Sequence, residues 1–78
     1  MGKHYLLNLY ECNVELLNNE KYLRSLIETA ADCSGATVVQ IISKKFDPQG
    51  VTAITLLSES HISIHTWPER GNAAVDVF

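Results

Sequence analysis

Hydrophobic and polar positions change their spacing several times along the chain, and each change marks an expected element. Residues 4–11 are rich in apolar and aromatic side chains but too short for a stable helix, so they predict a strand. The next periodic stretch, between Asn19 and Gly35, has its apolar residues at helical spacing. We expect four of them on one face: Leu23, Leu26, Ile27 and Ala30.

Polar residues with capping ability bound the helical stretches. Asn19 is expected to cap the main helix, and Asn13 a short helical turn over residues 14–17. Gly35 is expected to end the main helix in a left-handed conformation. Glu20 and Arg24 stand four residues apart, a spacing that favours an ion pair on the helix surface.

The remainder of the chain alternates strand-like stretches with turn residues. The predicted strands cover 37–46, 51–57, 61–67 and 73–78, separated by turns at 47–50 and 68–72 and by a short connection at 58–60. Turns of hairpin length favour antiparallel neighbours. The order β-α-β-β-β-β therefore predicts an α+β fold, a two-layer α/β sandwich in which one helix packs on a mostly antiparallel sheet. We expect residues 1–78 to form a single domain.

The stretch 61–67 has two chemically different faces if it is a strand, because successive side chains point to opposite sides. One face carries Ile62, Ile64 and Thr66 and can pack against the helix. The other face carries His61, Ser63, His65 and Trp67. Two histidines and a tryptophan are unusual on a purely solvated face, so we expect a site there.

Size and composition narrow the possibilities further. A chain of 78 residues buries only about 60% of its unfolded surface, so its core is thin and a partner chain is expected to add stability. Cys12 and Cys33 lack the spacing of a metal or redox motif, and we expect both to be reduced and half-buried, with no metal site. The net charge of -3 and scattered basic residues argue against nucleic-acid binding.

No apolar run approaches the roughly 20 residues that span a bilayer, so no membrane association is expected. The first residues lead directly into a strand pattern without the apolar core of a signal peptide. We therefore expect a cytoplasmic protein.

Reactive residues concentrate at the start of the stretch 61–67. The hydroxyl of Ser60 could attack the carbonyl carbon of Glu59, giving an ester by N-to-O acyl shift. Loss of the Ser60 α-proton would then eliminate the Glu59 carboxylate and leave a dehydroalanine that hydrolyses to a pyruvoyl group. Histidine is the natural proton acceptor for this route. The residues alone leave a hydrogen-bonded strand serine with surface histidines as an alternative, whereas a Ser-His-Asp hydrolase would require a G-x-S-x-G motif that is missing.

The run Glu-Ser-His-Ile-Ser-Ile-His-Thr-Trp-Pro-Glu, residues 59–69, closely resembles the processing site of prokaryotic S-adenosylmethionine decarboxylases. The resemblance extends to residues 35–39, 50–51 and 73–78 and covers essentially the whole chain. It implies cleavage between Glu59 and Ser60, with Ser60 as the precursor of the pyruvoyl group. It also implies that His65 is the base for the elimination step. Thr52 stands where the family usually has a serine that assists processing.

The resemblance also implies substrate-binding roles. Phe46 and Trp67 match residues that sandwich the adenine ring, and Glu69 matches the acid that binds the ribose hydroxyls. Each has a structural alternative. Phe46 could be a core residue, Trp67 a packing lid over the adjacent proline, and Glu69 a solvated turn charge. His61 is expected to be mainly structural.

By this resemblance the chain would decarboxylate S-adenosylmethionine to the aminopropyl donor for spermidine and other polyamines. The pyruvoyl group would bind the substrate amine as a Schiff base and act as electron sink, without an external cofactor. Family members form homodimers or larger homo-oligomers. A pyruvoyl-dependent ornithine or arginine decarboxylase, or a non-catalytic ligand-binding or regulatory paralogue, are the alternatives.

One departure concerns the C-terminus. The family continues past Phe78 with Thr-Cys-Gly, whose cysteine is the catalytic proton donor, and then with another helix and more strands. We expect residues 73–78 to lie at an unpaired, apolar sheet edge, where a native chain seldom stops. The sequence therefore predicts a domain that is incomplete at its C-terminus.

Overall fold

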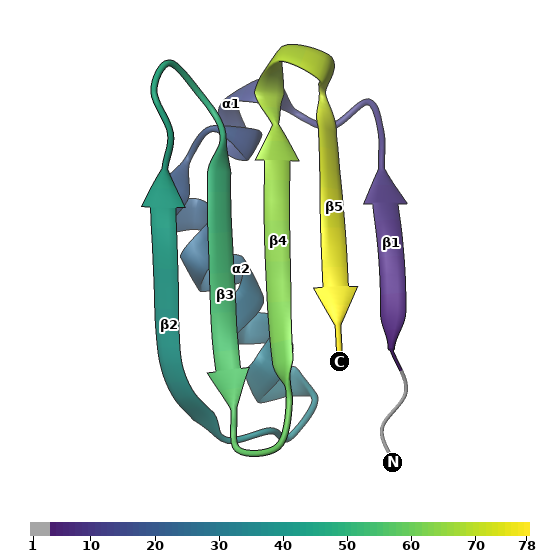
Figure 1. The fold of residues 1–78 in the computed structure, drawn as a ribbon, viewed down its shortest axis with the longest axis vertical. Helices are drawn as coiled ribbons and strands as arrows, with labels where there is room; N and C mark the ends of the chain where they lie inside the picture. Colours follow the sequence, from purple (N-terminus) through teal and green to yellow (C-terminus); the bar gives the residue numbers. More distant parts are fainter. Residues whose placement is uncertain (1–3) are drawn as a thin grey trace.

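Residues 4–78, which the computed structural model describes, form one antiparallel sheet with helices on one face (Figure 1). The strands are β1 (Tyr5–Leu9), β2 (Val38–Lys45), β3 (Val51–Leu57), β4 (His61–Trp67) and β5 (Asn72–Val77). The helices are α1 (Val14–Leu17), α2 (Glu20–Cys33) and the 3-10 turn η1 (Pro68–Arg70). This arrangement confirms the predicted α+β two-layer sandwich and its order of elements.

The strands lie in the order β1-β5-β4-β3-β2. The last strand is therefore internal: Val77 pairs with Tyr5 of β1 on one side and with Ile62 of β4 on the other. The expectation of an unpaired edge at residues 73–78 is wrong, because β1 pairs with the outer side of β5. The free edges of the sheet within the described residues belong to β1 and β2.

The predicted caps hold both helices as expected. The side-chain oxygen of Asn13 accepts a hydrogen bond from the Leu16 backbone at 3.1 Å, and that of Asn19 accepts one from Tyr22 at 3.0 Å. Each bond satisfies a backbone N–H that has no partner inside its helix. Gly35 follows α2 with φ of 79°, which confirms the left-handed residue predicted there.

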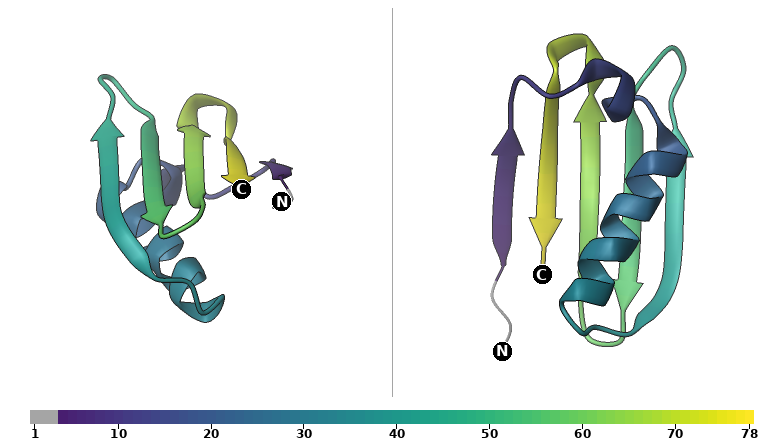
Figure 2. Two further views of the ribbon diagram at one scale, coloured as in Figure 1. Left: turned by 60° about the horizontal axis from the view of Figure 1, so that its bottom comes forward. Right: turned by 180° about the vertical axis from the view of Figure 1, so that it is seen from behind.

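The buried face of α2 differs from the prediction by one position. Leu23, Ile27 and Ala31 are buried, whereas Leu26 is 43% exposed and Ala30 is exposed. The cause is the position of the helix, which packs on β2, β3 and β4 and leaves β1 and β5 beside it (Figure 2, right). The Leu26 flank borders an apolar cavity of about 160 Å³.

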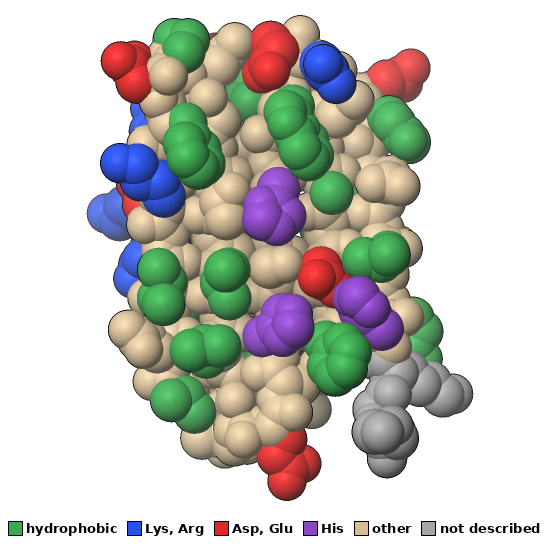
Figure 3. Space-filling model, viewed as in Figure 1, with side chains coloured by type: hydrophobic (Ala, Val, Ile, Leu, Met, Phe, Trp, Pro, Cys, Tyr) green, Lys and Arg blue, Asp and Glu red, His purple; other side chains and the backbone are tan. Residues whose placement is uncertain are grey.

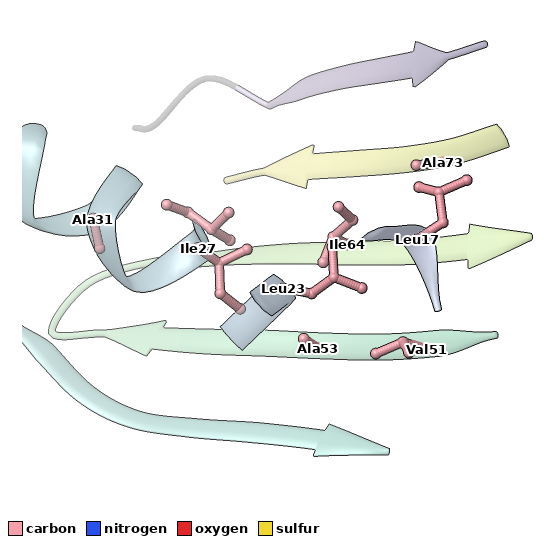
Figure 4. Packing of buried hydrophobic residues seen from close by; sticks show 9 residues of the cluster. Leu17, Leu23, Ile27, Ala31, Val51, Ala53, Ile64 and Ala73 are labelled. Carbon is pink, nitrogen blue, oxygen red and sulfur yellow. The ribbon is translucent and has the colours of Figure 1, made fainter. Parts of the chain in front are cut away.

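The core lies between α2, α1 and the central strands (Figure 4). It consists of Leu17, Leu23, Ile27, Ala31, Val51, Ala53, Ile62, Ile64 and Ala73. The Thr66 hydroxyl joins α1 to this layer, since it donates to the Leu17 carbonyl at 2.8 Å and accepts from the Val51 N–H at 2.9 Å. This bond network fixes the ends of β3 and β4 that lie nearest α1.

Glu20 and Arg24 are linked through a third residue instead of forming the expected direct pair. Arg24 Nη1 donates to the Ser43 hydroxyl at 2.8 Å, and that hydroxyl donates to Glu20 Oε2. Ser43 lies on β2, so the three side chains connect the helix to the outermost strand. Both side chains lie on the same side of α2, as their spacing predicted. However, they bind Ser43 and so join the helix to the sheet.

The cysteines match their prediction in part. Both are free, and Cys12 is half-buried as expected, but Cys33 at the end of α2 is exposed. Among residues 4–78, none of the helices has the length and apolar character needed to cross a membrane.

The two faces of β4 are as predicted. Ile62, Ile64 and Thr66 are buried under the helical layer, while Trp67 on the opposite side is 41% exposed. Figure 3 views this opposite side, which we call the open face of the sheet, and shows that histidine and hydrophobic side chains gather on it. The open face carries the residues on which the site depends.

Candidate functional site

Five of the predicted site residues line one cavity of about 230 Å³ at one end of the open face. These are Phe46, Thr52, His65, Trp67 and Glu69. They come from the ends of β2, β3 and β4 and from η1, which meet at the same end of the sheet (Figure 1). We call this the pocket end of β4.

Two aromatic residues from the ends of different strands line the cavity. Phe46 follows the last residue of β2 and Trp67 ends β4, with β3 between them. Neighbouring strands are about 4.8 Å apart, so the two backbones are separated by roughly 10 Å. That separation admits one flat ring stacked on both sides. Phe46 is 47% exposed, so it is not the core residue that one alternative assumed.

The floor of the cavity is a paired hydroxyl and imidazole. Thr52 and His65 are opposite each other in the β3–β4 register, and Thr52 Oγ1 lies 3.0 Å from His65 Nδ1. The hydroxyl fixes the orientation of the ring, because only one ring nitrogen faces it. His65 Nε2 is left for a ligand or a proton.

Two loops form the rim. Glu69 belongs to η1, and Gln49 belongs to the connection between β2 and β3. The second loop is tied to α1 by the Gly50 N–H, which donates to Asn18 Oδ1 at 3.0 Å. Gly50 has φ of 106°, and a Cβ there would lie 3.3 Å from the Thr66 carbonyl oxygen, so glycine is required at this close approach.

Sequence reasoning missed three lining residues: Gln49, Gly50 and Thr66. Residues 47–50 were predicted as a turn, but a turn sequence does not show which of its residues border a cavity. Thr66 could not be predicted as a lining residue. Its side chain points to the core, where it binds the Leu17 carbonyl, whereas its backbone borders the cavity.

Ser60 and Glu59 lie at the opposite end of β4. The Leu57 N–H donates to the Ser60 carbonyl at 2.9 Å, closing a tight turn that contains Ser58 and Glu59. Glu59 is exposed and Ser60 is half-buried. His65 is five positions after Ser60 along an extended strand, which corresponds to a distance of about 17 Å. Within one chain the imidazole does not reach the Glu59–Ser60 bond.

A second group of side chains surrounds this turn, which we call the cleavage end of β4. His61 Nε2 lies 3.7 Å from Asp76 Oδ2, and the His61 ring is stacked on Phe78 with centroids 5.8 Å apart. His4 hydrogen-bonds the other oxygen of Asp76. The His61 contacts fit the structural role expected for that residue, while Asp76, Phe78 and His4 were not anticipated.

In the part of the chain that the structure describes, no group of three or more His, Cys, Asp or Glu side chains is arranged to hold a metal ion.

Known proteins with this sequence pattern agree on one family. Residues 3–78 match the family model for S-adenosylmethionine decarboxylase. The chain is 58% identical over all 78 residues to the S-adenosylmethionine decarboxylase proenzyme of Prochlorococcus marinus (strain MIT 9313), covering 62% of that protein. It is 47% identical over 78 residues to the proenzyme of Methanococcus aeolicus, covering 67% of it.

A solved structure supports the same assignment. The crystal structure of the adenosylmethionine decarboxylase from Aquifex aeolicus VF5 superimposes with a TM-score of 0.87 at 38% identity, over 94% of this chain and 60% of that one. Fold and sequence thus define a protein of the adenosylmethionine decarboxylase type. The chain belongs to the S-adenosylmethionine decarboxylase family. It spans about three fifths of the length of the curated relatives first matched.

Proposed function

We propose that this chain takes part in the pyruvoyl-dependent decarboxylation of S-adenosylmethionine, which yields the aminopropyl donor for polyamine synthesis. The observation that carries the proposal is the cavity at the pocket end, where two aromatic rings, a carboxylate and a Thr–His pair face one space. Family membership supports the substrate class.

The cavity suits an adenosine group with a positive charge attached. Phe46 and Trp67 stack on the two sides of the adenine ring, and their π faces also attract the sulfonium cation. Glu69 accepts two hydrogen bonds from the ribose hydroxyls, a geometry that a carboxylate supports well. Ornithine and arginine have no ring to fill the gap between the aromatic residues, so a nucleoside substrate is favoured.

The pyruvoyl group would come from Ser60 by cleavage of the Glu59–Ser60 bond, without an external cofactor or a metal. The Ser60 hydroxyl attacks the Glu59 carbonyl carbon, and the peptide nitrogen leaves with a proton as the ester forms. The exposed turn fits this chemistry, because Glu59 lies outside the paired strands and the bond can break while β3 and β4 stay paired. The resulting group supplies an electron sink for loss of carbon dioxide.

We further propose that two copies of the chain complete each site. His65 is about 17 Å from Ser60 along one strand, so the base must come from elsewhere. The open face displays apolar side chains that a second sheet would cover: Val39, Ile42 and Leu56 are 64%, 49% and 37% exposed. A twofold axis crossing β4 near Ser63 brings the pocket end of one copy over the cleavage end of the other.

In this arrangement the residues have separate tasks. Thr52 orients His65, whose free Nε2 removes the Ser60 α-proton of the partner copy and so eliminates the Glu59 carboxylate. Phe46, Trp67 and Glu69 hold the adenosine part of the substrate beside the same reacting centre. The domain, residues 1–78, would thus be one half of a symmetric pair.

Intact mass measured after incubation at neutral pH tests the proposal. We expect the wild-type chain to divide into fragments 1–59 and 60–78, with the second fragment carrying a blocked N-terminus. Ser60→Ala should remain one species, whereas Ser58→Ala, a serine in the same turn, should divide like the wild type. A wild-type chain that stays whole would contradict the proposal.

A further inference from the structure

The segment 11–18, which leads from β1 through α1, is hydrogen-bonded to three parts of the pocket end. Two of these bonds were described above: one holds the loop between β2 and β3, and the other holds the end of β4. The third is made by Cys12, whose backbone N–H donates to the Gly71 carbonyl at 2.9 Å. Gly71 ends η1, the turn that carries Glu69, so this bond fixes the part of the rim where the carboxylate lies.

Glu11, directly before this bond, has a backbone conformation that few side chains adopt. Its φ is 55°, and among residues 4–78 it is the one residue other than glycine with a positive φ. In the left-handed region Cβ comes too close to the following carbonyl oxygen, so the region is left mostly to glycine and, less often, to asparagine and aspartate. A residue that stays there is held by its surroundings, and such residues concentrate at functional sites.

The register of the sheet shows what this conformation achieves. The ladder between β1 and β5 ends with Leu9 opposite Ala73. Continued by two residues, it would place Glu11 opposite Gly71. The bond to the Gly71 carbonyl is instead made by Cys12, one position further along the chain. An extra residue in the left-handed conformation is a common way for a strand to make such an offset and bend.

The turn at Glu11 and the end of η1 are in direct contact, and Figure 2 (right) shows the connection from β1 to α1 passing beside η1. Gly71 is also left-handed, and a Cβ built on it would lie 3.9 Å from Glu11 Cα and 3.7 Å from the Cys12 carbonyl oxygen. If Glu11 left the left-handed region, the Cys12 N–H would turn away from Gly71. The end of η1 that follows Glu69 would then lose its support.

We propose that Glu11 is a positioning residue, whose left-handed backbone directs the Cys12 N–H to η1 and so holds Glu69 at the cavity. The role belongs to the backbone, because the side chain of Glu11 is exposed. This inference rests on the proposed function, since it requires Glu69 to bind the ribose hydroxyls. It predicts that a residue outside the cavity lining affects recognition of the ribose but not stacking of the adenine ring.

Trp67 provides the measurement, because it lines the cavity and is the sole tryptophan in the sequence. Its fluorescence, excited at wavelengths where purines do not absorb, reports a ring bound in the cavity. Adenosine and 2′,3′-dideoxyadenosine, which lacks both ribose hydroxyls, are titrated into the wild type and the variants. We expect the wild type to prefer adenosine roughly tenfold or more, the value of two hydrogen bonds to a carboxylate. Glu69→Ala should abolish this preference.

Substitutions of Glu11 separate its backbone from its side chain. Glycine and asparagine adopt the left-handed conformation readily, so Glu11→Gly and Glu11→Asn should keep the preference although both remove the charge. Valine is β-branched and is rarely found there, so Glu11→Val should lower the preference to about twofold or less, while dideoxyadenosine binds as in the wild type. Glu15→Val, at an exposed position of α1, is the matched control and should behave like the wild type. A merely structural role would lower the stability of Glu11→Val to urea and leave its preference unchanged.

A second measurement on the wild type covers the case in which Glu11→Val does not fold. Hydrogen exchange of the Cys12 N–H is compared with the cavity saturated by each nucleoside in turn. Adenosine, held by Glu69, should slow this exchange at least about twofold relative to dideoxyadenosine, because coupling between two sites is reciprocal.

The outcomes separate the inference from the proposed function. Loss of the preference in Glu11→Val, with its retention in Glu11→Gly, supports both. An unchanged preference in Glu11→Val, equal exchange of the Cys12 N–H with both nucleosides, or loss of the preference in Glu11→Gly and Glu11→Asn overturns the positioning role and leaves the adenosine site standing. Equal binding of the two nucleosides by the wild type, or no change in its Trp67 fluorescence, overturns the proposed site and the role of Glu11 together.

Discussion

The two ends of β4 contain equally reactive residues but are built differently. At the pocket end, backbone bonds fix the loops around the cavity, including Gly50 to Asn18, and Thr66 ties its strand to Leu17 of α1. At the cleavage end, partly exposed side chains gather around Asp76, and the bond proposed for cleavage lies in a tight turn. The comparison indicates that the pocket-end cavity is part of the fold itself, whereas the turn at Glu59 is only loosely supported by the fold.

The largest effect should come from two variants that each remove one end of β4 from the cleavage reaction, Ser60→Ala and His65→Ala. Neither Ser60→Ala nor His65→Ala should process alone, because each lacks one of the required ends. The two variants are unfolded together in equal amounts and then refolded. Statistical pairing should place roughly half of the His65→Ala chains in mixed dimers, where they can divide. Intact mass identifies which variant was cut. Normal division of His65→Ala by itself would show that the base belongs to the cleavage end, with His61 the first candidate.

The rigidity of the pocket end should appear in a substitution at Gly50. Gly50→Ala places a Cβ 3.3 Å from the Thr66 carbonyl oxygen at φ of 106°. We expect the free energy of unfolding to fall by about 2–3 kcal/mol. Gly35→Ala is the control, since Gly35 also has a positive φ but open space around it, and should cost about 1 kcal/mol. Urea denaturation of both variants measures the difference, and equal losses would deny the close approach.

A smaller effect is expected from the hydroxyl that joins β4 to α1. Thr66→Val removes the acceptor of the Val51 N–H and the donor to Leu17, so unfolding should become easier by about 1–2 kcal/mol. Thr55 on β3 is the matched control, because its hydroxyl is fully buried without a hydrogen-bond partner. Thr55→Val should be neutral or stabilising in the same urea measurement. A loss at Thr55 as large as that at Thr66 would contradict the assigned bonds.

The smallest effect should occur at the cleavage end. Asp76→Asn weakens the contacts to His4 and His61, but all three side chains are between 29% and 44% exposed. Solvent screens such contacts, so the free energy of unfolding should change by less than about 1 kcal/mol. Thermal denaturation can compare it with Glu59→Gln, which alters an exposed charge in the adjacent turn. A loss above that at Thr66 would mean that the cleavage end is as firmly built as the pocket end.

The sequence predicted most of the fold because its signals were local. Alternation in residues 61–67 identified the buried and open faces of β4, and the asparagine caps located both helix starts. Strand order was not predictable in the same way. The position of β5 between β1 and β4 depends on pairing between residues about seventy positions apart in the sequence. The buried face of α2 was misplaced at Leu26 and Ala30, since spacing alone does not reveal which flank the sheet covers.

The site was predicted as one cluster, and the structure divides it. The cavity brings together Phe46, Thr52, His65, Trp67 and Glu69. The roles that the family resemblance implies for them stay predictions. Ser60 is near His65 in sequence but not in space, because an extended strand advances about 3.4 Å per residue. Gln49 was missed because nothing in a turn sequence distinguishes a side chain facing a cavity from one facing water.

The strand order has a consequence for the fragments that cleavage would produce. Cutting the chain before Ser60 would leave β4 and β5 as a hairpin inserted between β3 and β1, both of which belong to the longer fragment. The short fragment would be hydrogen-bonded along both of its outer edges and would place Ile62, Ile64 and Ala73 in the shared core. The two pieces would therefore stay together without a covalent link, and the new N-terminus would remain where the turn had been.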